Sequence, residues 1–304
     1  MKDLLFYRSH STPNQVSLID TTTDKHWTYS SLNDEVNKLS TILLQEGIQP
    51  MEKVGLFLDT SAQSILTIYA LLRIGSLCVP ISNKSSSEEI SNFINTAKLN
   101  RLFWQTNSPK DPLDFGIPST SLETLPPTSS INLSDISTSI PHESQLDDTC
   151  LLLFTSGTTG ISPKIVPLTY RNLLSSSISS ALRLKTDPND IWILYLPLHH
   201  MGGLSPLFRS IISGTAIAAI DSPSPQNLQL CMQKYGITCL STVPTLLTKL
   251  LNEQVDLSTL RILLLGGGLI PESLLAQCKS LSIPVHPTYG ATEASSQITT
   301  ATPS

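Results

Sequence analysis

Short apolar runs that alternate with amphipathic stretches dominate this chain. Residues 29–47, 61–74 and 86–98 show helical character, and in the first of these Leu32, Val36, Leu39 and Leu43 recur at steps of four, three and four. Strands that are separated by helices are typical of parallel sheets with helices packed on them. The sequence therefore predicts an α/β fold with two doubly wound parallel sheets and flanking helices. The expected strands lie at 53–59, 76–81, 101–104, 150–155, 164–169, 191–198, 215–220, 237–243, 261–265 and 283–288.

The composition changes between the two groups of runs. Residues 105–149 are rich in Ser, Pro, Thr and Asp and have no sustained hydrophobic period, which is typical of a connection. We expect a first α/β lobe over about 1–104, this Ser/Pro-rich connection over about 105–149, and a second lobe over about 150–304. The length of 304 residues suits one large domain or two ordinary ones.

Composition and charge exclude several functional classes. The chain has 19 Lys and Arg against 24 Asp and Glu, a formal net charge of −5, and no basic patch suited to nucleic acid. No run approaches the roughly 18 apolar residues of a membrane span, and the N-terminus does not resemble a signal peptide. The five cysteines lack a C-x-x-C pair, which predicts reduced core thiols of a cytoplasmic protein: Cys78, Cys150, Cys231, Cys239 and Cys278.

The loop TSGTTGISPK at 155–164 lies between two expected strands. In a glycine-containing segment, backbone N–H groups can converge on an anion, while hydroxyls and a lysine add donors and charge. This is not a Walker loop, because G-x-x-x-x-G-K-S/T is absent. An ordinary polar turn is the alternative, but the lysine and the preceding buried strand favour phosphate binding. The residues concerned are Thr155, Ser156, Gly157, Thr158, Thr159, Gly160 and Lys164.

Three further loops follow expected strands. Three consecutive glycines at 266–268 would allow a flat ligand to approach the backbone closely. In the loop at 288–297, Tyr289 offers a ring for stacking and Glu293 a hard oxygen ligand for Mg²⁺. At 196–204, two adjacent histidines lack further ligands at zinc spacing. Each loop taken alone could also be an ordinary turn or surface loop.

Taken in order, these loops carry a shared pattern. It reads strand–TSGTTG–PK, LPL-x-H-x-x-G, V-P-T-L-L, G-G-G-x-x-P and Y-G-x-T-E, and it resembles the acyl-adenylate-forming (AMP-binding) superfamily. The resemblance covers the chain from about residue 12 to its end. Within the superfamily, LPLHHMGGLSPLFRS, TCLSTVPTLLTKLL and IPVHPTYGATEASSQITT are most similar to o-succinylbenzoate–CoA ligases of menaquinone synthesis. Ligases for other aromatic or fatty acids share much of this pattern.

The resemblance implies an ATP-dependent acid–CoA ligase that uses Mg²⁺ and coenzyme A. The acid would first form an acyl-adenylate, and the thiol of coenzyme A would then displace AMP. By this likeness, the loop at 155–164 with Lys164 holds the β- and γ-phosphates, and Glu293 holds Mg²⁺. Thr292 would contact the α-phosphate. The adenine would lie between the glycine turn and the 289–290 segment, which involves Gly266, Gly267, Gly268, Tyr289 and Gly290.

The resemblance also implies an acid-binding pocket. His200 matches the histidine that lies near the reacting carboxylate, so that His200, Lys164, Thr292 and Glu293 are the candidate catalytic residues. Arg209 is a candidate partner for a second carboxylate of the acid, although pairing with another part of the protein suits this residue equally well. The expected lining residues are Ser241, Val243, Pro244, Gly268 and Ser296.

The chain departs from the family pattern in three places. Ile161 and Ser162 precede Pro163 where the family has one residue, and Ile165 replaces a glycine. His199 stands where an aromatic residue is usual. Members of the family also continue beyond the Y-G-x-T-E loop through a small barrel and a C-terminal lid. These departures leave open an incomplete nucleotide-binding fragment or a non-catalytic module. They also leave open a homo-oligomer, or a separate chain that supplies the lid.

Overall fold

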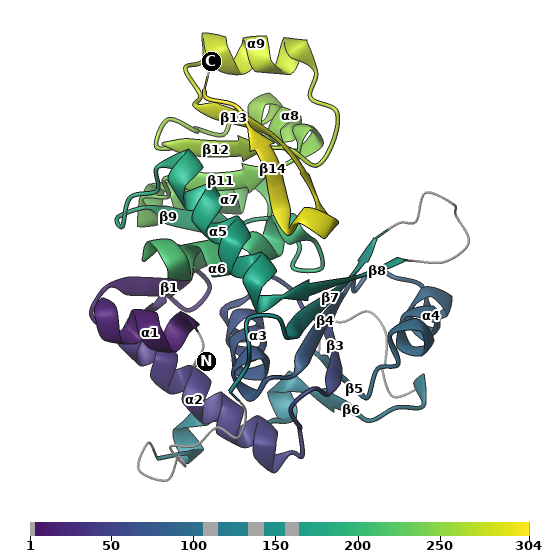
Figure 1. The fold of residues 1–304 in the computed structure, drawn as a ribbon. Helices are drawn as coiled ribbons and strands as arrows, with labels where there is room; N and C mark the ends of the chain where they lie inside the picture. The colour runs from purple at the N-terminus through teal and green to yellow at the C-terminus, as the bar shows by residue number, and fades with distance from the viewer. Residues whose placement is uncertain (1–3, 106–114, 133–142, 156–163, 304) are drawn as a thin grey trace. The chain divides into compact units, whose positions relative to one another are not determined.

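The computed structural model describes residues 4–105, 115–132, 143–155 and 164–303 (Figure 1). Two compact units are present. Unit 1 comprises Met1–Pro13, Tyr29–Asp59 and Gln63–Asn172, and unit 2 comprises Asn14–Thr28, Thr60–Ala62 and Leu173–Ser304. Each unit contains one β-sheet with helices packed on it, as the sequence predicts for an α/β fold.

Unit 1 is built on a six-stranded sheet with the order β6-β5-β3-β4-β7-β8. Its strands pair in parallel, except that β7 and β8 pair antiparallel. The strands are β3 (Lys53–Phe57), β4 (Leu77–Ile81), β5 (Arg101–Trp104), β6 (Ser119–Ser121), β7 (Thr149–Thr155) and β8 (Lys164–Thr169). The helices are α1 (Leu4–Ser11), α2 (Tyr29–Gln45), α3 (Ala62–Ile74) and α4 (Ser87–Ala97).

Local sequence explains why these helices form where they do. On α2, Leu32, Val36, Leu39 and Leu43 are buried along one face, as their helical spacing predicts. At the start of α4, Ser86 and Glu89 form a reciprocal capping box, which satisfies two backbone N–H groups at the helix end. The expected helices at 29–47, 61–74 and 86–98 are therefore confirmed.

Unit 2 is built on an eight-stranded sheet with the order β14-β13-β12-β11-β9-β10-β1-β2. The six inner strands pair in parallel, and β2 and β14 pair antiparallel at the two edges. The strands are β1 (Val16–Asp20), β2 (Lys25–Thr28), β9 (Ile191–Leu194), β10 (Ala216–Ala219), β11 (Cys239–Thr242), β12 (Ile262–Leu265), β13 (Val285–Ala291) and β14 (Ser296–Thr300). The helices are α5 (Tyr170–Leu184), α6 (Met201–Ser213), α7 (Pro225–Tyr235), α8 (Pro244–Asn252) and α9 (Glu272–Ser280).

The sheet membership of two segments differs from the expected lobes. Strands β7 and β8 lie in the sheet of unit 1, where Cys78 of β4 pairs with Leu151 of β7. Conversely, β1 joins the sheet of unit 2 through the pair Leu18 and Ile217. Part of the expected connection also belongs to unit 1, because β6 pairs with β5. Hydrophobic periodicity predicts that a strand is buried, but it does not predict which strand lies beside it.

The five cysteines are all free and buried. Burial raises the pKa of each thiol above its ordinary value, because the thiolate is poorly solvated there. Cys78 and Cys150 lie in unit 1, and Cys231, Cys239 and Cys278 lie in unit 2. Among the described residues, no helix has the length and apolar character that crossing a bilayer requires.

Candidate functional site

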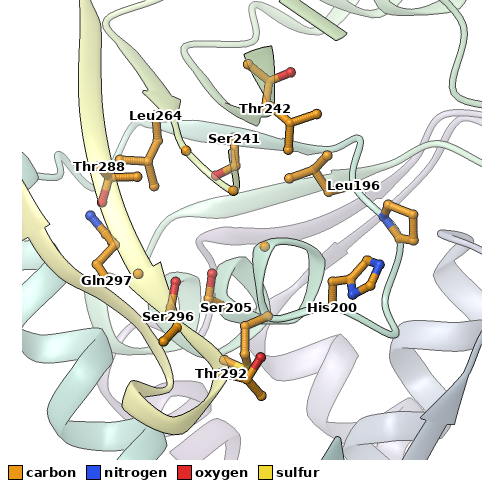
Figure 2. Close-up of a pocket in the computed structure, with 18 residues that line it drawn as sticks. Leu196, His200, Ser205, Ser241, Thr242, Leu264, Thr288, Thr292, Ser296 and Gln297 are labelled. Carbon is orange, nitrogen blue, oxygen red and sulfur yellow. The ribbon is translucent and has the colours of Figure 1, made fainter. Parts of the chain in front are cut away.

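A cavity of about 430 Å³ lies in unit 2 beyond the carboxyl ends of β11 and β12 (Figure 2). Ligands of open α/β sheets bind at this end of the strands, and the volume is within the range of small-molecule pockets. Five segments form its wall, and each follows or contains a strand. The lining residues are Leu196, Pro197, His200, Met201, Gly202, Ser205, Ser241, Thr242, Val243, Leu264, Gly266, Gly267, Thr288, Gly290, Ala291, Thr292, Ser296 and Gln297.

The start of helix α6 forms one side of the cavity. His200 immediately precedes the helix in an extended conformation, and its ring lies 4.2 Å from that of His199, centroid to centroid. A Cβ atom on Gly203 would lie 2.2 Å from the carbonyl oxygen of Pro197. This glycine therefore lets the first turn of α6 pack directly against the segment after β9. Partial desolvation lowers the pKa of His200, so its imidazole is neutral at pH 7.

The glycine turn after β12 forms a second side. A Cβ atom on Gly266 would lie 2.7 Å from the carbonyl oxygen of Thr288, and Gly267 has a φ of +77°. Glycine is thus required at 266 by the close approach of β13 and at 267 by the backbone conformation. Gly268 does not line the cavity, and its nearest neighbour is 3.9 Å away, on Pro244.

The β13–β14 hairpin forms a third side. A Cβ atom on Gly290 would lie 2.0 Å from the carbonyl oxygen of Ser296, so the two strands meet closely here. Ser296 has a φ of 117°, a conformation that non-glycine residues rarely adopt. Between them, Thr292 begins a short 3₁₀-helix and its side chain lines the cavity (Figure 2). Glu293 and Tyr289 are exposed and lie outside the wall, and Tyr289 is 66% exposed.

Arg209 lies behind the cavity wall rather than on it. It is 1% exposed, and its guanidinium stacks 3.9 Å from the ring of Trp192. It donates hydrogen bonds to Ser241 Oγ at 3.4 Å and to Gln297 Oε1 at 3.3 Å, and both of these residues line the cavity. Burial lowers the pKa of Arg209 to about 10, so the guanidinium stays charged at neutral pH.

The remaining residues of the acid pocket lie at the end of β11. Ser241 and Val243 line the cavity, and Val243 immediately precedes α8. Pro244 is the first residue of α8 and is buried outside the wall. A proline at this position has no N–H to lose and favours the helical φ angle. It therefore fixes where α8 begins and, with it, the position of Val243.

Only the two ends of the expected phosphate loop are described. Thr155 ends β7 and Lys164 begins β8, and these two residues pair in antiparallel register in unit 1. The strand expected after the loop is confirmed. Lys164 is exposed. Five expected phosphate-binding residues lie outside the described part of the chain: Ser156, Gly157, Thr158, Thr159 and Gly160.

Several lining residues were not expected from the sequence. Ser205 lies four positions after Met201, so helical spacing could have placed both on the same face of α6. Thr288 and Gly290 both line the cavity from β13, where a register shift between Tyr289 and Gly290 interrupts the regular alternation of the strand. Gln297 lies on β14, a strand that hydrophobic periodicity does not predict.

Comparison with known proteins identifies the family. A family model described as AMP-binding enzyme matches residues 5–304. The 2-succinylbenzoate–CoA ligase of Bacillus pumilus is 35% identical over 300 residues, which cover 98% of this chain and 60% of that protein. The corresponding ligase of a Bacillus cereus strain is 32% identical over 303 residues, again covering 60% of its length. This chain thus spans about 60% of the length of these relatives.

Solved structures give the same result. The o-succinylbenzoate coenzyme A synthetase of Bacillus subtilis in complex with AMP matches with a TM-score of 0.89 and 29% identity, covering 100% of this chain and 77% of that chain. The same enzyme in complex with ATP and a magnesium ion matches with a TM-score of 0.87 and 28% identity, covering 100% and 62%. From the family model, the relatives and these folds, we conclude that the chain belongs to the AMP-binding enzyme family.

Proposed function

We propose that this chain forms the nucleotide- and acid-binding part of an AMP-forming acid–CoA ligase of the o-succinylbenzoate–CoA ligase type. One observation carries the proposal: the cavity of unit 2 is lined by residues from each of the motif-bearing segments of that unit. His200, Ser241, Gly266 and Thr292 are far apart in sequence, and the fold brings them to one cavity. Two relatives are named for this reaction and matched over nearly all of the present chain.

For the nucleotide, we propose that the glycine turn and Tyr289 flank the adenine. The turn offers bare backbone, and the tyrosine has an exposed ring that can stack on a base. Thr292 then contacts the α-phosphate. Glu293 holds Mg²⁺, a cation that proteins bind through one or two carboxylates together with substrate phosphates. Thr155 and Lys164 bound the loop to which we assign the β- and γ-phosphates.

For the acid, we propose that one carboxylate lies beside His200. A neutral imidazole can donate one hydrogen bond to this carboxylate without neutralising it. The carboxylate oxygen attacks the α-phosphorus of ATP, and pyrophosphate leaves. The thiol sulfur of coenzyme A then attacks the acyl carbon, and AMP leaves as the thioester forms. The chain's contribution to the first step is positioning and neutralisation of charge.

We assign the second anionic group of a diacid to the wall formed by Ser241 and Ser296. Both residues offer hydroxyl donors, and Arg209 places a positive charge directly behind Ser241. Val243 supplies apolar contact. Pro244 and Gly268 act through the position of α8 and the glycine turn. Coenzyme A, ATP and the acid are thus the proposed small-molecule partners.

The proposal is tested by isotope exchange. We expect labelled pyrophosphate to exchange into ATP only when o-succinylbenzoate and Mg²⁺ are present. Thr292→Val should lower the exchange rate by roughly 100-fold or more, because it removes a hydrogen bond to developing charge. Calorimetry with Mg·ATP and with AMP measures binding separately. Absence of any heat with either nucleotide at millimolar concentration would refute the proposal.

A second candidate function is a nucleotide-binding module without turnover. The extra residue in the loop, where Ile161 and Ser162 precede Pro163, favours it because the insertion changes the spacing to Lys164. This candidate predicts heat on addition of nucleotide but no exchange with any acid. A panel of aromatic and fatty acids in the same exchange assay distinguishes it from a ligase for another acid.

A further inference from the structure

Arg209 is a buried cation without an acidic partner among the described residues. Its guanidinium contacts three neutral oxygens, those of Ser180 at 3.2 Å, Gln297 at 3.3 Å and Ser241 at 3.4 Å, and within the described part of the chain its Nε has no hydrogen-bond partner. Buried charges in proteins are normally paired, because removing a charge from water is costly. Arg209 therefore keeps a positive charge that the surrounding described residues do not neutralise.

Gln297 is held so that its oxygen faces this cation. Its Oε1 accepts hydrogen bonds from Arg209 and from Ser180 Oγ, the latter at 2.5 Å. Its Nε2 donates to Thr300 Oγ1 at 2.7 Å, and Thr300 Oγ1 lies 3.1 Å from Thr288 Oγ1. Both ends of the amide are thus occupied, and Figure 2 shows its nitrogen directed toward Thr288. The orientation of the side chain is fixed at both ends.

The backbone before Gln297 is strained in a way that places it there. Ser295 and Ser296 have φ angles of 56° and 117°. The carbonyl of Ser295 accepts a hydrogen bond from Ser176 Oγ at 2.8 Å, which ties this bend to α5. Residues in sparsely populated conformations persist only where the surroundings enforce them, and they concentrate at ligand sites. Here the strain immediately precedes the residue that touches both the cavity and Arg209.

We propose that Gln297, supported by Ser180, is a positioning residue that gives the cavity its preference for an acid with a second anionic group. A neutral amide oxygen holds the guanidinium in place without cancelling its charge, so that the charge remains for the ligand. Ser241 links Arg209 to the cavity through a chain of hydrogen bonds. Arg209 donates to Ser241 Oγ, and the hydroxyl keeps its own O–H for donation to a ligand in the cavity. This inference rests on the proposed function.

The decisive substitution is Gln297→Glu, which differs from the native side chain by one group and places a carboxylate against Arg209. The probes are two sulfamoyl-adenosine analogues of the acyl-adenylate. One carries o-succinylbenzoate, and the other carries 4-oxo-4-phenylbutanoate, which lacks the second carboxylate. We expect Gln297→Glu to reduce the preference for the diacid probe by about 10-fold or more, because an internal carboxylate neutralises the guanidinium and repels the ligand. Calorimetry measures the dissociation constant of each probe. The preference is the ratio of the dissociation constant of the probe without the second carboxylate to that of the diacid probe.

Two matched variants separate positioning from a structural role. Gln297→Met keeps the size but carries no charge, and we expect it to change the ratio several-fold less than Gln297→Glu. Ser180→Ala removes one support of the amide and should lower the ratio only a few-fold. We expect the unfolding temperature of Gln297→Glu to match or exceed that of the native chain, because it pairs a buried charge.

Each outcome decides between the proposals. If native chain prefers the diacid and Gln297→Glu keeps that preference, the positioning role is contradicted while the proposed function stands. Equal weakening of both probes, accompanied by a lower unfolding temperature, also contradicts it, because Gln297 would then only stabilise the fold. If native chain binds neither probe, the proposed function fails and this inference fails with it.

Discussion

Two antiparallel hairpins carry two of the motifs of this chain, and they are attached to their sheets in different ways. In unit 1, β7 and β8 flank the 155–164 loop, and in unit 2, β13 and β14 flank the segment with Thr292 and Glu293. The β7–β8 hairpin is attached by apolar side chains, since Leu151, Leu153, Val166 and Leu168 are all buried. Burial of apolar surface is the dominant favourable contribution to folding.

In the β13–β14 hairpin, Val285 at the start of β13 packs in the core of unit 2, whereas the part that includes β14 is attached mainly by polar contacts. From α5, Ser176 donates to the carbonyl of Ser295, Ser180 donates to Gln297, and Arg183 donates to the carbonyl of Thr300 at 2.7 Å. A hydrogen bond contributes about 1 kcal/mol net, less than a buried leucine. The first hairpin is therefore part of the core of its unit, whereas we expect β14 and the bend before it to open locally without unfolding of unit 2.

The largest effect should come from the core of the first hairpin. Leu153→Ala is expected to lower the free energy of unfolding by about 2–5 kcal/mol, because Leu153 is 1% exposed and its truncation leaves a cavity. Denaturant unfolding measures this loss. The control is Leu182→Ala on α5, where the side chain is 75% exposed and the change should stay within about 0.5 kcal/mol. Similar losses for the two variants would contradict the conclusion that buried apolar side chains hold the β7–β8 hairpin.

The second effect concerns the close approach within the second hairpin. Gly290→Ala places a Cβ atom 2.0 Å from the carbonyl oxygen of Ser296, and separating the strands should cost about 1–3 kcal/mol. Hydrogen exchange should increase across 285–300 and remain as in the native chain across 149–155. Gly268→Ala is the matched control, since its nearest neighbour lies 3.9 Å away. A global rise in exchange would show that this hairpin is also part of the core.

A smaller effect is expected for one polar attachment. Ser176→Ala removes the hydrogen bond to the carbonyl of Ser295 and should cost about 1 kcal/mol. Because the bond lies at the bend before β14, exchange should rise in β14 and not in β12. Native-state hydrogen exchange resolves the two strands. Unchanged exchange in β14 would mean that α5 does not hold the hairpin.

The smallest effect is a pH dependence that arises from His286 in the second hairpin. Desolvation lowers the pKa of His286 on β13, and nearby Arg183 and Arg261 lower it further, although a hydrogen bond with the backbone of Ala301 opposes this. The unfolded chain therefore binds a proton that the folded chain does not. The stabilisation from neutral His286 is present above the ordinary histidine pKa of about 6.5 and is lost as the pH falls through the folded value.

The matched variant for this pH dependence is His286→Gln, which removes the titrating ring. Comparing its free energy of unfolding with that of the native chain between pH 5 and pH 8 isolates the contribution of His286. We expect the difference between the two proteins to shrink as the pH falls. A difference that does not vary with pH would show that His286 does not contribute to the pH dependence of stability.

Much of the fold follows from local sequence. The face of α2, the inner strands other than β1 and the parallel pairing inside each sheet are expected from hydrophobic spacing, and the structure confirms them. Local pattern could not assign β1 to unit 2, because its partner Ile217 lies about two hundred positions away in the chain. Nor could it predict the antiparallel edges, which depend on tertiary neighbours.

The candidate site was predictable to a similar degree. His200 and Thr292 follow strands and Ser241 lies near the end of one, and the structure places all three on one cavity wall. For Arg209 the sequence left ligand binding and internal pairing open, and the structure shows it behind the wall, bonded to neutral oxygens. The reason for Gly203 could not be read from sequence, because it depends on the carbonyl of Pro197 across a turn.

Each unit contains its own buried cysteines, so the reaction of these thiols with a reagent shows when that unit opens. A thiol that is both inaccessible and protonated does not react with alkylating reagents, so modification occurs only after a unit opens. Brief exposure to iodoacetamide, followed by peptide mass spectrometry, would tag Cys78 and Cys150 when one unit opens and Cys231, Cys239 and Cys278 when the other does. The native chain thus reports its two opening rates without any introduced label.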